Sequence, residues 1–163
     1  MVARLRSAAM VVAMLGLTSA CLWAQSPGGQ SGPSATTAAQ TLSGGQVIVV
    51  VPRSRDAVLA YSQTLGCWCR QPIKVASNAP ILPIVGDDVA AFKIGDEVFA
   101  FSAVLARWKS LSLPPDSKAE LVVASKYVTI HAGNVFHVFS PKTCRWSSVN
   151  LDSGVIEAQK RDE

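Results

Sequence analysis

The chain has 163 residues, of which 15 are Lys or Arg and 11 are Asp or Glu, giving a formal net charge of +4. Two of the basic residues, Arg4 and Arg6, lie in an N-terminal leader, and the rest of the chain carries a net charge of about +2. The remaining basic residues are scattered singly, which excludes the clustered footprint of a nucleic-acid-binding protein.

Residues 1–24 have the layout of a secretory signal peptide. Arg4 and Arg6 precede an apolar run over residues 8–17, and small residues follow it. The run is shorter than the roughly 20 residues that cross a bilayer, so an uncleaved transmembrane anchor is the weaker interpretation. We therefore expect an exported protein, secreted or periplasmic.

The leader has two candidate processing sites. The sequence LTSAC, ending at Cys21, resembles a lipobox, the bacterial motif whose cysteine becomes the lipidated first residue of a lipoprotein. The other site lies after Ala24 and would release a chain that begins QSPGG. Cleavage after Ala24 is favoured because Thr18 stands where the lipobox prefers Leu. Lipidation of Cys21, which would anchor the protein to a membrane, is the alternative.

Two segments are predicted to lie outside the folded core. Residues 25–46 consist of small and polar residues with Leu42 as the single large apolar one, so they cannot bury enough surface to offset the entropy cost of ordering. They predict a flexible low-complexity linker. Residues 152–163 predict a short charged C-terminal tail.

One phrase occurs three times between these segments, at residues 60–68, 100–108 and 138–146. Aligning its copies on Ser62, Ser102 and Ser140 places a Trp six residues later in each, and the copies are 40 and 38 residues apart. Before each Ser comes a short apolar run, and before that run comes a turn pair: Arg55-Asp56, Gly95-Asp96 and Gly133-Asn134. Gly-Asp and Gly-Asn predict hairpins because these residues accept the positive φ of tight hairpin turns.

Apolar runs around these turns predict the strands. One run precedes each turn (47–51, 89–94 and 127–130), and each Trp opens a further strand. Residues 81–85 and 121–125 would each supply one additional strand, before the second and the third unit. A fixed period near 40 predicts stacked units that hide their apolar faces against each other. The predicted fold class is all-β, with three antiparallel β-meander repeats of about 38–40 residues over residues 47–151, propeller-blade-like; a β-sandwich is the alternative.

The phrase resembles the kelch repeat of β-propellers, in which an aromatic-rich strand ends in a polar residue and a Trp follows six residues later. The matching positions are Tyr61, Trp68, Phe101, Trp108, Phe139 and Trp146. The resemblance implies that these six are structural residues of the repeat core, and no catalytic residue carries over. The chain departs from kelch in its Ser where kelch has Asp, in its lack of a Gly-Gly pair, and in its shorter period.

Three units leave two terminal faces bare, and exposed apolar faces and strand edges favour association. A homodimer that completes a six-bladed ring would cover them, since propellers close with four to eight blades. Closure of the three units on themselves and a β-sandwich are the alternatives.

Three cysteines lie in the exported part, where disulfides are permitted. By the alternation of a strand, Cys67 and Cys69 point away from the face of Trp68, whereas Cys144 shares the face of Trp146. Where the first and third units meet, within a chain or across a dimer, Cys144 would bridge to Cys67 or Cys69. Free thiols are the alternative.

The pair Cys67 and Cys69 could hold zinc or copper with His131 or His137, since thiolate and imidazole suit both metals. However, a two-residue hairpin at Gly133-Asn134 would pair His131 with Phe136 and place His137 on the opposite face. The spacing also differs from that of structural zinc sites. We therefore expect no metal and no cofactor.

The close acidic pairs, Asp87-Asp88 and Asp96-Glu97, lie at predicted turns, where carboxylates commonly solvate a loop. The repeat serines lack a nucleophile-elbow sequence. We therefore expect an exported, non-enzymatic β-repeat module of the cell envelope that is structural or binds a protein or glycan, and does not bind nucleic acid. The alternative is an envelope enzyme or metal-handling protein centred on Cys67 and Cys69 with a histidine.

Overall fold

The computed structural model describes residues 39–74 and 80–158, and every helix or strand element in these ranges is a β-strand. Sheet A consists of β1 (Gln40–Gly44), β2 (Val47–Val51), β3 (Ala57–Ser62) and β4 (Cys67–Pro72). Sheet B consists of β5 (Ile84–Val85), β6 (Val89–Ile94), β7 (Glu97–Ser102) and β8 (Arg107–Ser112). Sheet C consists of β9 (Ala119–Val123), β10 (Val128–Ala132), β11 (Val135–Ser140), β12 (Arg145–Asn150) and β13 (Ile156–Ala158).

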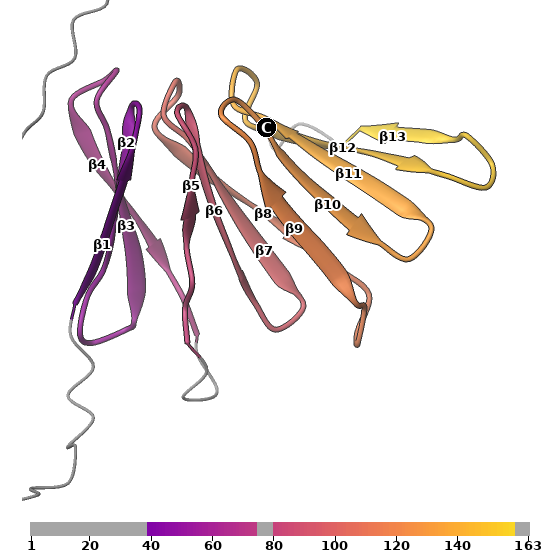
Figure 1. Cartoon of the computed structure of the whole chain (residues 1–163), viewed down its shortest axis with the longest axis horizontal. Coiled ribbons are helices and arrows are strands. Elements are labelled where there is room, and N and C mark those ends of the chain that lie inside the picture. The colour runs from indigo at the N-terminus through magenta and orange to yellow at the C-terminus, as the bar shows by residue number, and fades with distance from the viewer. Residues whose placement is uncertain (1–38, 75–79, 159–163) are drawn as a thin grey trace, which may run out of the picture. The chain divides into compact units, whose positions relative to one another are not determined.

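Within each sheet the strands are antiparallel and neighbour each other in chain order. The prediction of an all-β fold with three antiparallel β-meander repeats is therefore confirmed. Figure 1 shows the three sheets following one another, from indigo through pink to orange and yellow. No helix able to cross a membrane occurs among residues 39–74 and 80–158.

The register of the strands explains the repeated phrase. In each sheet the aromatic residue before the serine lies directly opposite the tryptophan of the next strand: Tyr61 opposite Trp68, Phe101 opposite Trp108, and Phe139 opposite Trp146. The ring centroids of these pairs are 5.2, 5.1 and 5.2 Å apart. Aromatic pairs at this spacing stabilise a sheet beyond their buried area.

The turn inside the phrase is also the same in all three copies. Two residues before each tryptophan, Gly66, Ala106 and Cys144 have φ angles of +65°, +47° and +50°. Only the first copy uses glycine, the residue that takes this conformation without steric cost. The six-residue interval from serine to tryptophan therefore reflects one tight turn and the start of one strand.

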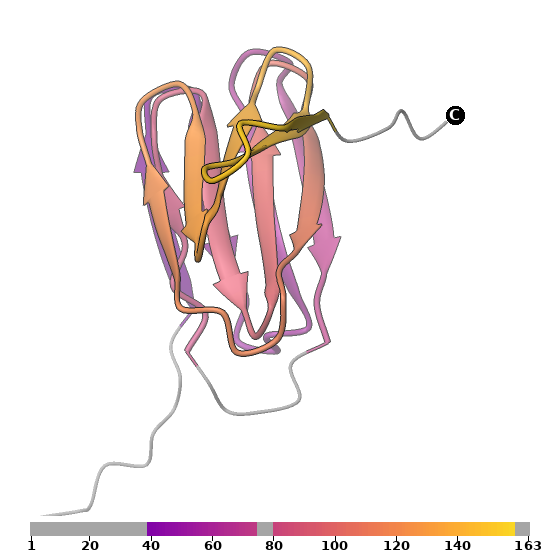
Figure 2. The same ribbon diagram turned by 90° about the vertical axis from the view of Figure 1, so that its right-hand side faces the viewer.

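The core is divided between the two spaces that separate the sheets. One cluster of buried side chains joins sheets A and B, and it includes Val49, Ala60 and Phe101. The second joins sheets B and C, and it includes Ala100 and Trp146. Sheet B is thus covered on both faces, and Figure 2, which looks along the stack, shows the sheets lying behind one another.

Burial on both faces explains the composition of β6. Its first four residues, Val89 to Phe92, are all buried, whereas β2, the equivalent strand of sheet A, alternates between buried and partly buried positions. A strand covered on one face needs an apolar residue only at every second position. The continuous apolar run of β6 is therefore the local signature of the middle sheet.

Two predicted boundaries were wrong. Residues Gln40–Gly44, assigned to the flexible linker, form β1, because their backbone pairs with β2 and the turn at Gly45 has a φ of +44°. This turn packs so closely on sheet B that a Cβ at Gly45 would lie 2.4 Å from Asp87 Cα. Residues Ile156–Ala158, assigned to the charged tail, form β13, which pairs with β12. The leader, Cys21 and linker residues 25–38 lie outside the described residues.

Candidate functional site

The repeat serines link neighbouring sheets. Ser62 and Ser102 are fully buried, and their Oγ atoms donate to the carbonyl oxygens of Ala103 (2.5 Å) and Pro141 (2.6 Å) in the following sheet. Each Oγ also accepts a hydrogen bond from a backbone N–H of its own turn. A buried hydroxyl satisfied in this way is a structural group, which agrees with its position in the repeat.

The tryptophans of the repeat have very different surroundings. Trp146 is 1% exposed, Trp108 is partly buried, and Trp68 is 56% exposed. The Trp108 indole N–H donates to the Cys69 carbonyl of sheet A at 3.3 Å. Trp68 belongs to the first of the three sheets, and no earlier sheet among the described residues covers it. The repeat therefore places an exposed aromatic side chain at one end of the stack.

The three described cysteines are free thiols. The Sγ atoms of Cys69 and Cys144 donate to the carbonyl oxygens of Ala106 (2.9 Å) and Arg107 (3.6 Å), and burial raises the pKa of both thiols. The predicted bridge from Cys144 to Cys67 or Cys69 is not formed within a chain, because sheet B separates sheets A and C. A raised pKa lowers the thiolate fraction and hence reactivity.

The two histidines lie on opposite faces of sheet C, as predicted. His131 is paired with Phe136 across the hairpin, with ring centroids 6.4 Å apart. His137 is buried, and its Nδ1 lies 2.7 Å from Ser148 Oγ. Cys67 and Cys69 belong to sheet A, so the proposed thiolate and imidazole ligands are not brought together in one chain. Among the described residues, no group of three or more His, Cys, Asp or Glu side chains is placed to hold a metal.

The burial of His137 gives a pH-dependent stability. Burial lowers its pKa below the ordinary value of 6.5, so the unfolded chain takes up a proton at a higher pH than the folded chain. We expect the free energy of unfolding to fall as the pH drops below about 6.5, until the folded-state pKa is passed. The equivalent position in sheet B is occupied by Phe99. The substitution His137→Phe, which introduces the same side chain in sheet C, should therefore reduce this pH dependence. Urea unfolding between about pH 7.5 and pH 5 measures it, and equal pH slopes in both proteins would contradict the assignment.

The acidic pairs have mostly backbone roles. The N–H groups of Asp87 and Asp88 both donate to the Ser125 carbonyl, at 2.8 and 2.9 Å, and so tie sheet B to sheet C. The Asp96 carbonyl accepts from the Leu113 N–H at 2.7 Å. Of these four acidic residues, only Glu97 lines a hollow on the surface described below.

That hollow lies between the edges of sheets A and B and has a volume of about 420 Å³. Its lining combines charged, polar and apolar side chains: Gln71, Pro72, Ile73, Lys74, Ile94, Glu97, Phe99 and Ser110. The volume is in the range of ligand pockets, and Lys74 and Glu97 supply a cationic donor and an anionic acceptor. This hollow could not be predicted from the sequence, because its two walls belong to different repeats.

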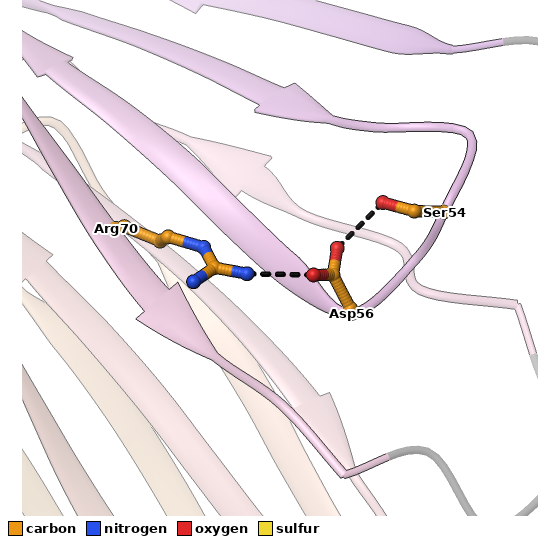
Figure 3. A network of polar contacts seen from close by, with 3 residues as sticks. All are labelled: Ser54, Asp56 and Arg70. Atoms are coloured by element: carbon orange, nitrogen blue, oxygen red, sulfur yellow. Dashed lines mark hydrogen bonds and ion pairs between the residues drawn. The ribbon is translucent and has the colours of Figure 1, made fainter.

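A polar network fixes the turn between β2 and β3 (Figure 3). Both oxygens of the Asp56 carboxylate accept hydrogen bonds, one from Ser54 Oγ (2.5 Å) and one from the Arg70 guanidinium (2.6 Å). The Ser54 hydrogen bond lowers the pKa of Asp56 most, and a backbone hydrogen bond and the Arg70 charge lower it further. The ion pair is more than half exposed, so it adds little to stability and mainly holds the turn against β4.

No family model and no curated protein matches this chain. Among solved structures, the chain is similar to the "Crystal structure of Kluyvelomyces marxianus Hsv2", with 11% sequence identity and a TM-score of 0.28. The match covers 58% of this chain and 30% of that chain.

Proposed function

We propose that the protein is an exported binding module whose three sheets are blades of a kelch-like β-propeller type. Export is supported by the leader with Arg4, Arg6 and the apolar run at residues 8–17. The blade assignment is supported by the meander sheets and by the repeated pairing of an aromatic residue with a tryptophan. The module is secreted or periplasmic, with lipidation at Cys21 as the alternative.

The proposed binding site is the hollow between sheets A and B. Its walls are set by the buried contact between the two sheets, so its shape exists before a ligand arrives. Lys74 and Glu97 offer opposite charges, and Gln71 offers an amide with both donor and acceptor. A glycan unit or a polar protein side chain matches such a lining better than an apolar ligand does.

The export step is tested by producing the full chain in a bacterial host with an outer membrane, followed by fractionation and mass measurement of the mature protein. A periplasmic or secreted chain that begins at Gln25 is expected. A lipid-modified chain that begins at Cys21 would select the lipoprotein form. An unprocessed chain in the cytoplasm would contradict export.

Binding is tested with a photo-reactive amino acid placed at Gln71 in the exported chain, and by sedimentation with purified cell-wall glycan. The matched control carries the same group at the exposed Lys142, in the turn between β11 and β12 of sheet C and outside the lining of the hollow. A discrete cross-linked product, or co-sedimentation, that is lost in Lys74→Glu and Glu97→Lys is expected. Both residues are exposed, so these variants should fold normally. Binding that neither substitution changes, or the absence of both a cross-linked product and co-sedimentation, would contradict the proposal.

A further inference from the structure

Each sheet has two unlike faces, and the same pair of faces meets twice. Between sheets A and B, the aromatic face of B (Phe92, Phe99, Phe101 and Trp108) packs on the aliphatic face of A (Val47, Val49, Val58 and Ala60). Between sheets B and C, the corresponding face of C (Val128, Ile130, Phe139 and Trp146) packs on the aliphatic face of B (Val89, Ala91, Val98 and Ala100). The stack is therefore directional.

Chain order leaves one face of each kind open. On sheet A the open face has the aromatic type, formed by Ile48, Val50, Leu59, Tyr61 and Trp68. On sheet C the open face corresponds to the aliphatic type, formed by Val122, Thr129, His131, Phe136 and Val138. A hollow of about 330 Å³ on this second face gives room for side chains of a packed partner. The open faces at the two ends of the stack are thus complementary in type, in the same way as the two faces that meet between neighbouring sheets.

The inter-sheet serine bond also has open ends. Ser140 is the third serine of the series, and it does not make the bond that Ser62 and Ser102 make, because sheet C is the last sheet among the described residues. The Gln63 carbonyl occupies the position of the acceptors Ala103 and Pro141, and its sheet is the first among the described residues. The equivalent donor, Ser140 Oγ, thus lies at one end of the stack, and the equivalent acceptor, the Gln63 carbonyl, lies at the other.

A backbone hydrogen bond repeats in the same direction. The Gln46 N–H of sheet A donates to the Asp87 carbonyl of sheet B at 2.6 Å, and the Asp88 N–H of sheet B donates to the Ser125 carbonyl of sheet C at 2.9 Å. The equivalent donor in sheet C is the Lys126 N–H, and sheet C is the last sheet that the described residues form. Two independent hydrogen bonds therefore define how a fourth sheet would dock.

We propose that the occupant of these faces is a second copy of this chain, docked head to tail. The open face of sheet A in one copy packs on the open face of sheet C in the other, and Ser140 Oγ donates to the Gln63 carbonyl across the contact. Because the contact is heterologous, it closes into a ring or continues as a filament. Two copies contribute six sheets, which lies within the four to eight that closed rings contain, so a closed dimer is expected.

A second copy fits these faces because they match the two sides of the contact that the chain already makes twice, between sheets A and B and between sheets B and C. The expected contact does not include the hollow with Lys74 and Glu97. The proposal of self-association and the proposal of ligand binding can therefore be disproved independently.

The test is the mass of the purified chain by light scattering over a range of protein concentrations. A mass of two copies is expected for the natural sequence. Trp68→Glu and Val122→Glu each place a charge on one open face, and each should reduce the mass to one copy. Both side chains are about half exposed, at 56% and 49%, so the fold should be retained. Leu82→Glu is the matched control, because Leu82 is 63% exposed but precedes the covered sheet B; it should remain a dimer.

Mixing the two monomeric variants separates head-to-tail docking from other arrangements. Each variant keeps the face that the other has lost, so the mixture should form a complex of one copy of each. A symmetric contact between like faces would leave one of the two variants dimeric and would overturn the proposal. A natural chain that stays monomeric at all concentrations, or an assembly that neither substitution affects, would also overturn it.

Discussion

Trp146→Ala is expected to lower the free energy of unfolding by about 3–5 kcal/mol, the typical cost of removing a large buried aromatic side chain. Trp146 is 1% exposed and packs on Phe139 within the cluster that joins sheets B and C. Its removal leaves a cavity between two sheets that the chain cannot easily close. Urea unfolding monitored by circular dichroism measures the change.

The control for this prediction is the same substitution in the first repeat. Trp68 occupies the equivalent position but is 56% exposed, and its main aromatic neighbour is Tyr61. At a concentration where the chain is monomeric, Trp68→Ala should cost only about 1 kcal/mol, the scale of an aromatic pair. Trp146→Phe should retain most of the stability, since the indole Nε1 has no hydrogen-bond partner among the described residues. Equal losses for Trp68→Ala and Trp146→Ala would contradict the assigned order of the sheets.

Ser102→Ala is expected to have the second-largest effect. The substitution leaves the buried Pro141 carbonyl without its donor and the Leu105 N–H without its acceptor. An unsatisfied buried group costs about 1–3 kcal/mol, so the loss should reach at least this range. The measurement is again the free energy of unfolding in urea.

Ser140→Ala is the matched control for Ser102→Ala. Ser140 stands at the same position of the repeat, but it lies in the last of the three described sheets, so the monomer should lose less than about 0.5 kcal/mol. Its effect should appear in the association of two copies instead. If Ser140→Ala destabilised the monomer as much as Ser102→Ala, the serine would act within its own sheet and not between sheets.

The sequence predicted the features that depend on neighbouring residues. The repeat interval, the hairpin at Gly133 and the pairing of His131 with Phe136 all follow from turn residues and strand alternation, which are local properties. For the same reason the three β-meander units could be predicted without reference to their packing. Their order in a stack could not.

Features that depend on contacts between repeats were missed. β1 looked like a linker because its residues are small and polar, and its strand conformation comes from pairing with β2 and from the contact of Gly45 with Asp87. The roles of Ser62 and Ser102 were hidden because their acceptors lie 41 and 39 residues away. One signal was available: the same polar residue at the same place in three apolar strands indicates a shared buried partner.

The tryptophans show a further limit of a repeat pattern. Trp68, Trp108 and Trp146 are equivalent in sequence, yet Trp68 is exposed, whereas Trp108 packs on sheet A and Trp146 is buried against sheet B. Equivalent sequence positions thus predict equivalent positions within a sheet. The place of the sheet in the stack decides how far the tryptophan is buried, and hence how much it contributes to stability.

The sheets stack in chain order through one repeated contact, and the nuclear Overhauser spectrum of the Trp108 indole proton tests this order most directly. This N–H donates to the Cys69 carbonyl of sheet A, so we expect cross-peaks to protons of Cys69 and its strand neighbours. We also expect cross-peaks to Phe92, whose ring centroid lies 5.4 Å from that of Trp108. Cross-peaks from the Trp108 indole to sheet C, with none to Cys69, would contradict the stacking order.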